Sequence, residues 1–383
     1  MKPKILATSW HPGGMNAIVP VIKRLNQQGK VNVVTVGHQY SKAILDSHGI
    51  GYKRIGDYGL KSVSLESMAA LLEQESPNLV LTGTSAQDEN NRDVIEQTVT
   101  LAGRKKGIPT IAVLDFWGSY SLRFNDIYSG EHFRFLPDKI AIMDQYAERD
   151  MLDEGFDKAG LVITGNPYFD DLEAKAKRFT NQERIELRQQ IGLDADIPFF
   201  YAANAWKKEK PNLGYWDLDN IQLVNEALRE MPERERQRYG LVVKLHPRVP
   251  QEDLDEISAY INGESEGKMR LVSGIHSQEL ILATDLTLTP FSTLGIEAVY
   301  MGKPCISMQP NLQSEDYLAI LTKNGIIPVG YTTEDCRALV KKAFVDDDYR
   351  EQELIQQASS FRTDGKATER VTNLVYDMEG LRK

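Results

Sequence analysis

The sequence alternates short, continuous apolar runs with stretches of helical pattern over most of its length. Twelve such runs, rich in β-branched residues, predict strands. Those of the first half span 4–10, 31–37, 78–83, 109–117, 139–143 and 160–167, and those of the second half span 197–205, 240–247, 269–274, 286–290, 304–309 and 326–330. Strands that are apolar throughout are typical of parallel sheets covered by helices on both faces. The chain is therefore predicted to be an α/β protein with doubly wound sheets.

The strands form two series, and the length of 383 residues exceeds what one hydrophobic core usually organises. We expect an N-terminal domain over residues 1–172 and a C-terminal domain over 180–349, with a charged helical stretch at 170–192 between the two series. Ligands of doubly wound sheets bind beyond the carboxyl ends of the strands. Two such domains facing each other across a cleft would place the functional residues at these strand ends.

The amino-acid composition and the net charge indicate which classes of binding partner and which compartment to expect. The net charge of −10, from 45 basic and 55 acidic residues, argues against a nucleic-acid-binding surface. Two cysteines give no disulfide framework, and the start of the chain shows no long apolar signal region, so we expect a cytoplasmic protein. No apolar run reaches the roughly 18 residues that span a bilayer. Peripheral contact with the inner face of a membrane stays open.

Three strand ends of the first domain carry candidate residues. His11, Gly13 and Gly14 follow the first strand, where glycines let the backbone approach a ligand and a helix start offers free amides. Asp115 follows the fourth strand and Asp88 the third, and either carboxylate could serve as a general base. Each has a structural alternative: a tight turn for the glycines, a structural histidine, and helix or loop caps for the aspartates.

Two strand ends of the second domain carry basic residues. Asn204 and Lys207 lie in the loop after the first strand of this domain, where they could meet phosphate oxygens or form a solvated loop. His246 and Arg248 follow the second strand, and an imidazole with a guanidinium suits a phosphate or pyrophosphate. The alternative for His246 is a bond to a neighbouring carbonyl group.

A third strand end predicts an anion site of a specific form. Ser292 is the expected N-cap of a helix whose first amides, those of Thr293, Leu294 and Gly295, would lie at the positive end of the helix dipole. Glu297 lies one turn later, where its carboxylate could accept from the two vicinal hydroxyl groups of a ribose. Amides for phosphate and a carboxylate for sugar predict a nucleoside diphosphate site.

Several of these stretches resemble motifs of GT-B glycosyltransferases. STLGIEAVYMGKP (292–304) is similar to the donor-site motif, in which helix amides take the pyrophosphate and the glutamate takes the ribose. KLHPR (244–248) is similar to the His-Pro motif of capsule sialyl- and Kdo-transferases and of CDP-glycerol glycerophosphotransferases, in which the histidine contacts the donor phosphate. HPGG (11–14) resembles the glycine-rich first loop of the enzyme that adds N-acetylglucosamine to the peptidoglycan lipid precursor.

Two further stretches concern the architecture. TGNPYFD (164–170) resembles the segment that closes the first domain in these proteins, and DGKATERV (364–371) resembles the C-terminal helix that packs back. The resemblance thus implies that helices within 350–383 pack on the first domain. It also implies a nucleotide-sugar donor held by the second domain, and a carbohydrate or lipid-linked acceptor held by the first.

The resemblance implies a glycosyltransferase that moves a sugar to an acceptor hydroxyl in the synthesis of surface polysaccharide or glycoconjugate. The E-x7-E pattern of many retaining members does not follow the donor strand, so we expect inversion, without a metal or other cofactor. Asp115, His11 and Asp88 are the candidates for the base, in that order. UDP is the favoured nucleotide and CMP the alternative.

Two other functions stay open. A UDP-N-acetylglucosamine 2-epimerase or nucleotide-sugar hydrolase is built on the same two domains, although Ser292–Thr293–Leu294 replaces the Ser-Gly-Gly of those epimerases. A nucleotide-sugar-binding protein without catalysis is the third function.

Overall fold

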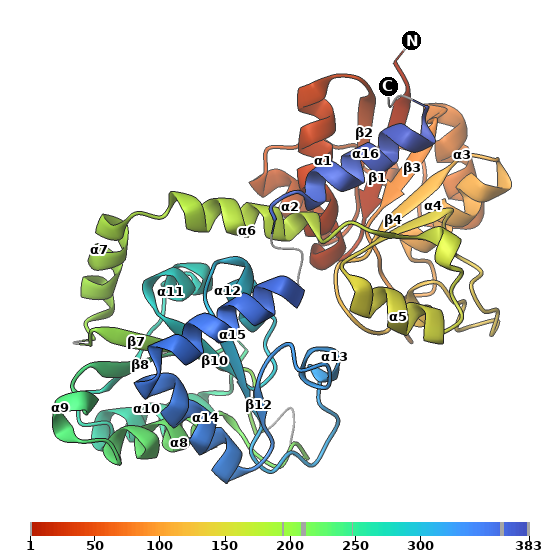
Figure 1. Ribbon diagram of the computed structural model, residues 1–383. Helices are drawn as coiled ribbons and strands as arrows, with labels where there is room; N and C mark the ends of the chain where they lie inside the picture. The colour runs from red at the N-terminus through yellow and green to blue at the C-terminus, as the bar shows by residue number, and fades with distance from the viewer. Residues whose placement is uncertain (1, 194, 208–211, 247, 361–363, 381–383) are drawn as a thin grey trace. The chain divides into compact units, whose positions relative to one another are not determined.

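The computed structural model describes the chain except residues 1, 194, 208–211, 247, 361–363 and 381–383 (Figure 1). The chain divides into two compact units. Unit 1 comprises Met1–Asp171 and Phe361–Lys383, and unit 2 comprises Leu172–Ser360. Helix α6 (Pro167–Arg178) carries the chain from one unit into the other.

Unit 1 is built on a parallel sheet of six described strands in the order β2-β1-β3-β4-β5-β6. The strands are β1 (Lys4–Ser9), β2 (Asn32–Gly37), β3 (Leu79–Thr82), β4 (Thr110–Val113), β5 (Lys139–Ile142) and β6 (Leu161–Ile163). Its α-helices, besides the start of α6, are α1 (Pro12–Gln28), α2 (Ser41–Ser47), α3 (Leu65–Glu75), α4 (Ile95–Lys105), α5 (Gln145–Asp153) and α16 (Ala367–Met378). The direction of winding reverses between β1 and β3, which makes this pair the topological switch point.

Alternate residues of β1 show why both faces of this sheet are covered. Ile5 and Ala7 pack into a core with α1 and with Val371 and Val375 of α16, which lies beside α1 (Figure 1). Leu6 points to the other face, into a core formed with α3 and α4. An apolar side chain is buried on either face, as the continuous apolar runs predicted.

Unit 2 repeats this architecture with the described strand order β12-β11-β10-β7-β8-β9, again parallel throughout. The strands are β7 (Ile197–Ala202), β8 (Tyr239–Lys244), β9 (Met269–Leu271), β10 (Leu286–Thr289), β11 (Cys305–Met308) and β12 (Val329–Gly330). The helices are α7 (Asn181–Ile191), α8 (Asp217–Arg229), α9 (Glu233–Arg236), α10 (Gln251–Glu264), α11 (Ser277–Ala283), α12 (Leu294–Tyr300), α13 (Ala319–Thr322), α14 (Thr333–Val345) and α15 (Asp347–Ser360). All twelve predicted strands are present, and the prediction of two doubly wound Rossmann-like domains is confirmed.

The two C-terminal helices belong to different units, which corrects the expectation that residues 350–383 pack together on the first domain. α16 packs on α1 in unit 1, whereas α15 packs on α12 and α14 in unit 2. Gln357 of α15 is fully buried, and its amide group donates to the carbonyl oxygen of Cys305 (2.9 Å) and accepts from the amide of the same residue (3.0 Å). These two hydrogen bonds to β11 tie α15 to unit 2.

The charged helical stretch at 170–192 forms two helices, the greater part of α6 and all of α7. Thr180 accepts from the amide of Glu183 (3.2 Å), and the Glu183 carboxylate accepts from the amide of Thr180 (2.6 Å). This capping box starts α7 anew directly after α6 has ended.

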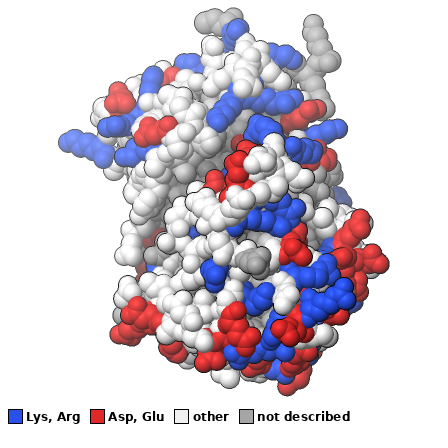
Figure 2. Space-filling model, turned by 90° about the vertical axis from the view of Figure 1, so that its left-hand side faces the viewer, with Lys and Arg blue, Asp and Glu red and all other residues white. Residues whose placement is uncertain are grey.

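None of the helices in the described part of the chain is long and apolar enough to cross a membrane. Cys305 and Cys336 are both buried free thiols. On the face shown in Figure 2, Lys and Arg side chains are interspersed with Asp and Glu over the lower part of the view, so charge of one sign does not dominate that region.

A buried carboxylate in unit 1 predicts pH-dependent stability. Burial alone would raise the pKa of Glu75, but hydrogen bonds from Lys53 (2.6 Å), Lys4 (3.0 Å) and Tyr58 (2.9 Å) lower that pKa to about 2. A depressed carboxylate pKa stabilises the fold above the unfolded value of about 4.5, and this contribution is lost as the pH falls toward 2. Glu75→Gln should therefore lower the unfolding free energy by on the order of 2 kcal/mol at pH 7, and by less at pH 3.

Urea unfolding at pH 7, 5, 4 and 3 measures this difference. Glu73→Gln is the matched control, because Glu73 is largely exposed and its ion pair with Lys106 (2.7 Å) should contribute little. A Glu75→Gln effect that is the same at all four pH values would contradict the assignment of the stabilisation to the ionised carboxylate.

Candidate functional site

The loop between β1 and α1 places three predicted residues of unit 1 together. His11 is the N-cap residue of α1, and its ring stacks on Trp10 (4.5 Å between centroids) and Tyr40 (6.0 Å). Gly13 and Gly14 lie in the first turn of α1. A Cβ atom on Gly14 would come within 2.6 Å of Ser9 Oγ, and one on Gly13 within 2.3 Å of Asp115 Oδ2. Close packing inside unit 1 therefore explains both glycines, and contact with a donor stays a prediction for them.

Asp115 lies at the end of β4 in a compact ion-paired network. Its Oδ1 accepts from Arg123 (2.6 Å) and from the Thr84 hydroxyl (2.9 Å), and Arg123 also donates to Thr84 Oγ1 (2.7 Å). The side chain is 16% exposed. Its Oδ2 accepts no hydrogen bond from the described residues and faces Gly13. One carboxylate oxygen is thus fixed by three-way contact with Arg123 and Thr84, while the other has no hydrogen-bond donor among the described residues.

Asp88 sits in a surface turn and is held by asparagines. Its carboxylate accepts from the Asn91 side chain (2.8 Å) and from the amide of Asn90 (2.8 Å). The hydrogen bonds from Asn91 lower the pKa of Asp88, and the nearby charge of His11 lowers it further. A carboxylate stabilised in this way is a weaker proton acceptor than an ordinary one.

A cavity of about 460 Å³ opens beyond the carboxyl ends of β1, β2 and β3, at the switch point of unit 1. Its lining is mostly polar: Trp10, His38, Gln39, Ser62, Val63, Asn90, Asn91, Arg92 and Asp93. Burial lowers the pKa of His38, and the charge of Lys42 adds to this, so both favour the neutral imidazole. The buried indole nitrogen of Trp10 has no hydrogen-bond acceptor among the described residues. Amides, a hydroxyl group and one charge of each sign suit a ligand rich in hydroxyl groups.

Glu96, which was not predicted from the sequence, is a buried carboxylate that binds the loops after β1 and β3. Its Oε1 accepts from Ser9 Oγ, Ser85 Oγ and the amide of Trp10, each at 2.7 Å, and the residue is 3% exposed. Its Oε2 lacks a partner among the described residues and lines a cavity of about 10 Å³ with Arg123, a volume on the order of one water molecule. Glu96 lies in the first turn of an amphipathic helical pattern, where a carboxylate normally faces solvent. The local sequence therefore does not indicate that Glu96 is buried.

In unit 2, the loop after β7 is organised by a buried carboxylate. Asp217 accepts from the amides of Asn204 (3.1 Å) and Ala205 (3.0 Å) and from the Tyr201 hydroxyl (2.8 Å). Burial raises the pKa of Asp217 to about 6 despite these hydrogen bonds.

Lys207, in the same loop, already has partners for its ammonium group. That group donates to Glu256 (2.8 Å) and lies 3.8 Å from the centroid of the Trp216 ring. A phosphate contact by Lys207 would have to replace the pair with Glu256.

The loop after β8 brings two predicted residues onto one aromatic ring. The His246 ring stacks on Trp206 at 4.9 Å, and the Arg248 guanidinium lies 5.8 Å from the centroid of the same indole. His246 Nδ1 accepts from the amide of Arg248 (3.2 Å), which assigns the imidazole proton to Nε2. Pro247, between them, lies outside the described residues. Trp206 was missed because stacking partners on another loop leave no pattern in the local sequence.

The start of α12 corrects one detail of the predicted anion site. The residue directly before α12 is Thr293 rather than Ser292, although Thr293 already has helical dihedral angles (φ −59°, ψ −18°) and its side chain caps no amide of the helix. Ser292 instead closes the preceding turn: its Oγ accepts from the amide of Leu294 (3.3 Å) and its carbonyl oxygen from the amide of Gly295 (3.1 Å). Of the three predicted amides, only that of Thr293 makes no hydrogen bond with the described residues.

Glu297 lies one turn into α12 and is oriented by α11. Gln278 Nε2 donates to Glu297 Oε2 (3.1 Å), and Gln278 Oε1 accepts from the Lys175 ammonium group (3.1 Å). The strand order places the ends of β10, β7 and β8 side by side, so the loops that carry Glu297, Trp206 and His246 leave the same edge of the sheet.

Residues 148–377, more than half of the chain, match the family model described as CDP-glycerol:poly(glycerophosphate) glycerophosphotransferase. No curated protein matches the sequence.

Solved structures match over nearly the whole chain. They include UDP-GlcNAc 2-epimerase from Neisseria meningitidis bound to UDP-GlcNAc (16% identity, TM-score 0.70, 98% of this chain and 100% of that one). A glycosyltransferase from Rickettsia africae has 12% identity and a TM-score of 0.63 (98% of each chain). The Anabaena protein HepE, in complex with UDP and glucose, has 13% identity and a TM-score of 0.61 (98% and 100%). At these identities the likeness shows the fold, which is GT-B.

Proposed function

Because the chain belongs to the CDP-glycerol:poly(glycerophosphate) glycerophosphotransferase family, we propose that it transfers a sugar from a nucleotide-activated donor to an acceptor hydroxyl group. The observation that carries the proposal is the edge of the unit 2 sheet, where three adjacent strand ends supply Trp206, His246 and Glu297. A ribose diphosphate needs donors for its phosphates and an acceptor for its hydroxyl groups, and these loops supply both.

The proposed chemistry follows from the protonation of these groups. The acceptor oxygen attacks the anomeric carbon, the bond from that carbon to the nucleotide oxygen breaks, and the nucleoside diphosphate leaves with the electron pair. His246 Nε2–H, the Arg248 guanidinium and the Thr293 amide would stabilise the charge that gathers on this leaving group. Asp115 Oδ2 would take the proton of the attacking hydroxyl group. We propose that none of these steps needs a metal.

The acceptor is proposed to bind in unit 1. The cavity at the switch point carries Arg92 beside Asp93, so its two formal charges offset each other. This balance favours a hydroxyl-rich acceptor group over a highly anionic one. The proposed acceptor is therefore a carbohydrate or the carbohydrate end of a lipid-linked carrier, met at the cytoplasmic face of the membrane.

Two alternative reactions are each supported by one of the comparisons. The family description names CDP-glycerol as a donor, and attack on its β-phosphorus with departure of CMP would use the same phosphate-binding groups. The similarity to UDP-GlcNAc 2-epimerases supports isomerisation of the donor as the second candidate.

Product analysis separates these functions. The protein is incubated with UDP-N-acetylglucosamine or CDP-glycerol, with and without a pool of saccharide acceptors, and products are identified by mass spectrometry and NMR. Acceptor-dependent release of UDP with a glycosylated product supports the proposal, whereas CMP release identifies glycerophosphate transfer. Free or UDP-linked N-acetylmannosamine without acceptor identifies an epimerase. Tight nucleotide binding without any product would leave only a binding protein.

A further inference from the structure

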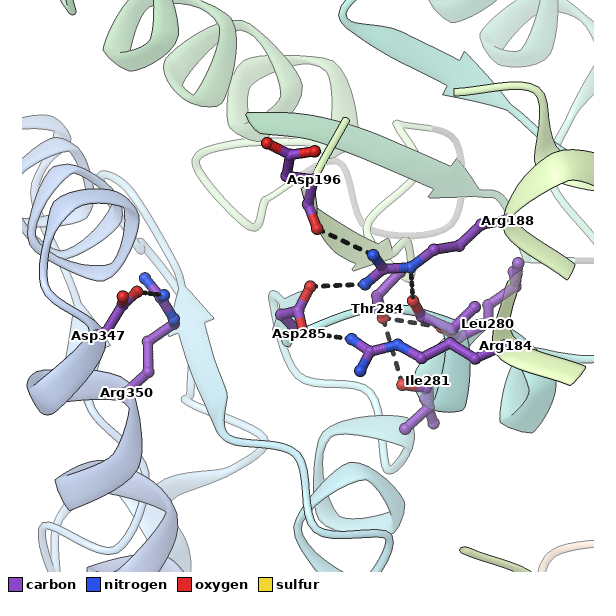
Figure 3. Close-up of polar contacts among 10 residues, drawn as sticks. Arg184, Arg188, Asp196, Leu280, Ile281, Thr284, Asp285, Asp347 and Arg350 are labelled. Atoms are coloured by element: carbon purple, nitrogen blue, oxygen red, sulfur yellow. Dashed lines mark hydrogen bonds and ion pairs between the residues drawn. The ribbon is translucent and has the colours of Figure 1, made fainter. Parts of the chain in front are cut away.

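A cluster of basic side chains lies at the opposite edge of the unit 2 sheet, where β7, β10 and β11 begin. Arg184 and Arg188 of α7 converge on the carboxylate of Asp285, which directly precedes β10 (Figure 3). Each of the three guanidinium nitrogens of Arg188 donates a hydrogen bond, to Asp285 (2.8 Å) and to the carbonyl oxygens of Ala283 (2.7 Å) and Asp196 (2.9 Å). Arg184 bonds only Asp285 among the described residues, and its buried Nε has no partner there.

Lys303 adds a third cation to this cluster. Thr287 of β10 lies opposite Cys305 of β11 in the parallel register, so Asp285 and Lys303 occupy corresponding positions two residues before them. The side chain of Lys303 is partly buried, and its ammonium group makes no hydrogen bond or ion pair with the described residues. Burial lowers the pKa of Lys303 to about 8, to which the positive charges of Arg184 and Arg188 contribute, whereas the negative charge of Asp285 acts to raise this pKa.

The charges of this cluster are unbalanced. Arg184, Arg188 and Lys303 carry three positive charges, against the carboxylate of Asp285 and the charge of Asp196, which acts on Arg188. The neighbouring Arg350 does not need that carboxylate, because it pairs with Asp347 (Figure 3). Partly buried charges without a counterion are costly, and the buried Arg184 Nε has no acceptor among the described residues.

We propose that Arg184 and Lys303 form a binding site for a small oxyanion of the sulfate or phosphate class at the amino-terminal edge of the unit 2 sheet. A guanidinium group and an ammonium group together match a tetrahedral oxyanion, with Asp285 and Arg188 holding Arg184 in place. The site is open to solvent, since the side chains of Arg184 and Asp285 are 29% and 26% exposed.

The proposed oxyanion site lies at the two ends of the chain segment that carries the proposed donor-binding residues of α12. Asp285 immediately precedes β10, and Lys303 follows the glycine, Gly302, that ends α12 with a left-handed φ of 74°. The segment between them carries Thr293 and Glu297. An anion that bridges Arg184 and Lys303 would therefore join α7 to the segment that follows α12, and so stabilise unit 2.

Sulfate is the probe, because it does not titrate near neutral pH. At pH 7 and constant ionic strength set with sodium chloride, 10 mM sulfate should raise the melting temperature of the wild-type protein by roughly 2–4 °C, with saturation in the low millimolar range. Lys303→Met should melt higher than wild type without sulfate, because the uncompensated charge is gone, and should lose the sulfate response. Arg184→Gln is the second variant and should lose the response as well.

Two control variants test whether the sulfate response comes from the site formed by Arg184 and Lys303. Lys323→Met removes an exposed lysine of unit 2 and should keep the full response. His246→Ala should also keep it, since the phosphate-binding loop is at the other edge of the sheet. A sulfate response that is equal in wild type and Lys303→Met, or that chloride reproduces, would overturn the oxyanion site. Loss of the response in His246→Ala alone would assign the anion to the donor site instead.

Discussion

Replacing Asp115 by asparagine is expected to lower turnover by about 100- to 10,000-fold while leaving nucleotide affinity unchanged, if this carboxylate accepts the proton of the attacking hydroxyl group. The substitution keeps the size of the side chain and an oxygen that can accept from Thr84 and Arg123, which hold Oδ1 at 2.9 Å and 2.6 Å. It removes only the basicity of the group whose other oxygen faces Gly13. Single-turnover rates with saturating donor and calorimetry with the free nucleotide measure the two quantities separately.

Thr84→Val is the matched control for this experiment. It deletes a hydroxyl group that bonds the same carboxylate oxygen but leaves the carboxylate and Arg123 in place, so turnover should fall by less than about tenfold. A wild-type rate in Asp115→Asn would exclude Asp115 as the base. His11→Gln would then be the next variant, because His11 lies in the adjoining loop and its ring is held between Trp10 and Tyr40.

The fold could be predicted because its signal is local and repeated. Most strands bury both of their faces, so they appear as apolar runs such as 197–203 or 140–143, and the order of runs and helices indicates a parallel sheet. The prediction was wrong where long-range tertiary contacts determine the unit on which a helix packs. Gln357 binds a strand residue 52 positions earlier, which assigns α15 to unit 2 although its sequence is an ordinary amphipathic helix.

The candidate site could be predicted only in part, for a related reason. The rule that ligands bind at strand ends singles out His246, Asp115 and Glu297 from the sequence alone. The partners of these residues come from elsewhere in the chain: Trp206 stacks on His246 from another loop, and Gln278 on α11 orients Glu297. Glu96 and Asp217 support the loops from buried positions, where nothing in the local pattern marks them as polar supports. The sequence thus predicts the strand ends, and the packing determines how the side chains at those ends are held.

Replacing Glu297 by alanine is expected to weaken binding of the preferred nucleoside diphosphate by about 10- to 100-fold, because hydrogen bonds to a charged group contribute about 1.5–3 kcal/mol. The carboxylate would accept from the ribose hydroxyl groups, while Gln278, which donates to its Oε2, keeps it oriented. Calorimetry with UDP or CDP, whichever binds the wild-type protein, gives the change in affinity.

The deoxynucleotide distinguishes a ribose contact from a general loss of structure. If Glu297 binds the ribose, the 2′-deoxynucleotide should bind the wild-type protein more weakly than the ribonucleotide, and Glu297→Ala should reduce this preference toward unity. Gln278→Ala should give an intermediate loss, since the carboxylate remains but one of its hydrogen-bond donors is removed. Should Glu297→Ala weaken both nucleotides by the same factor, Glu297 would act on the phosphates or on the fold of α12, and the assignment of the ribose to this helix would be wrong.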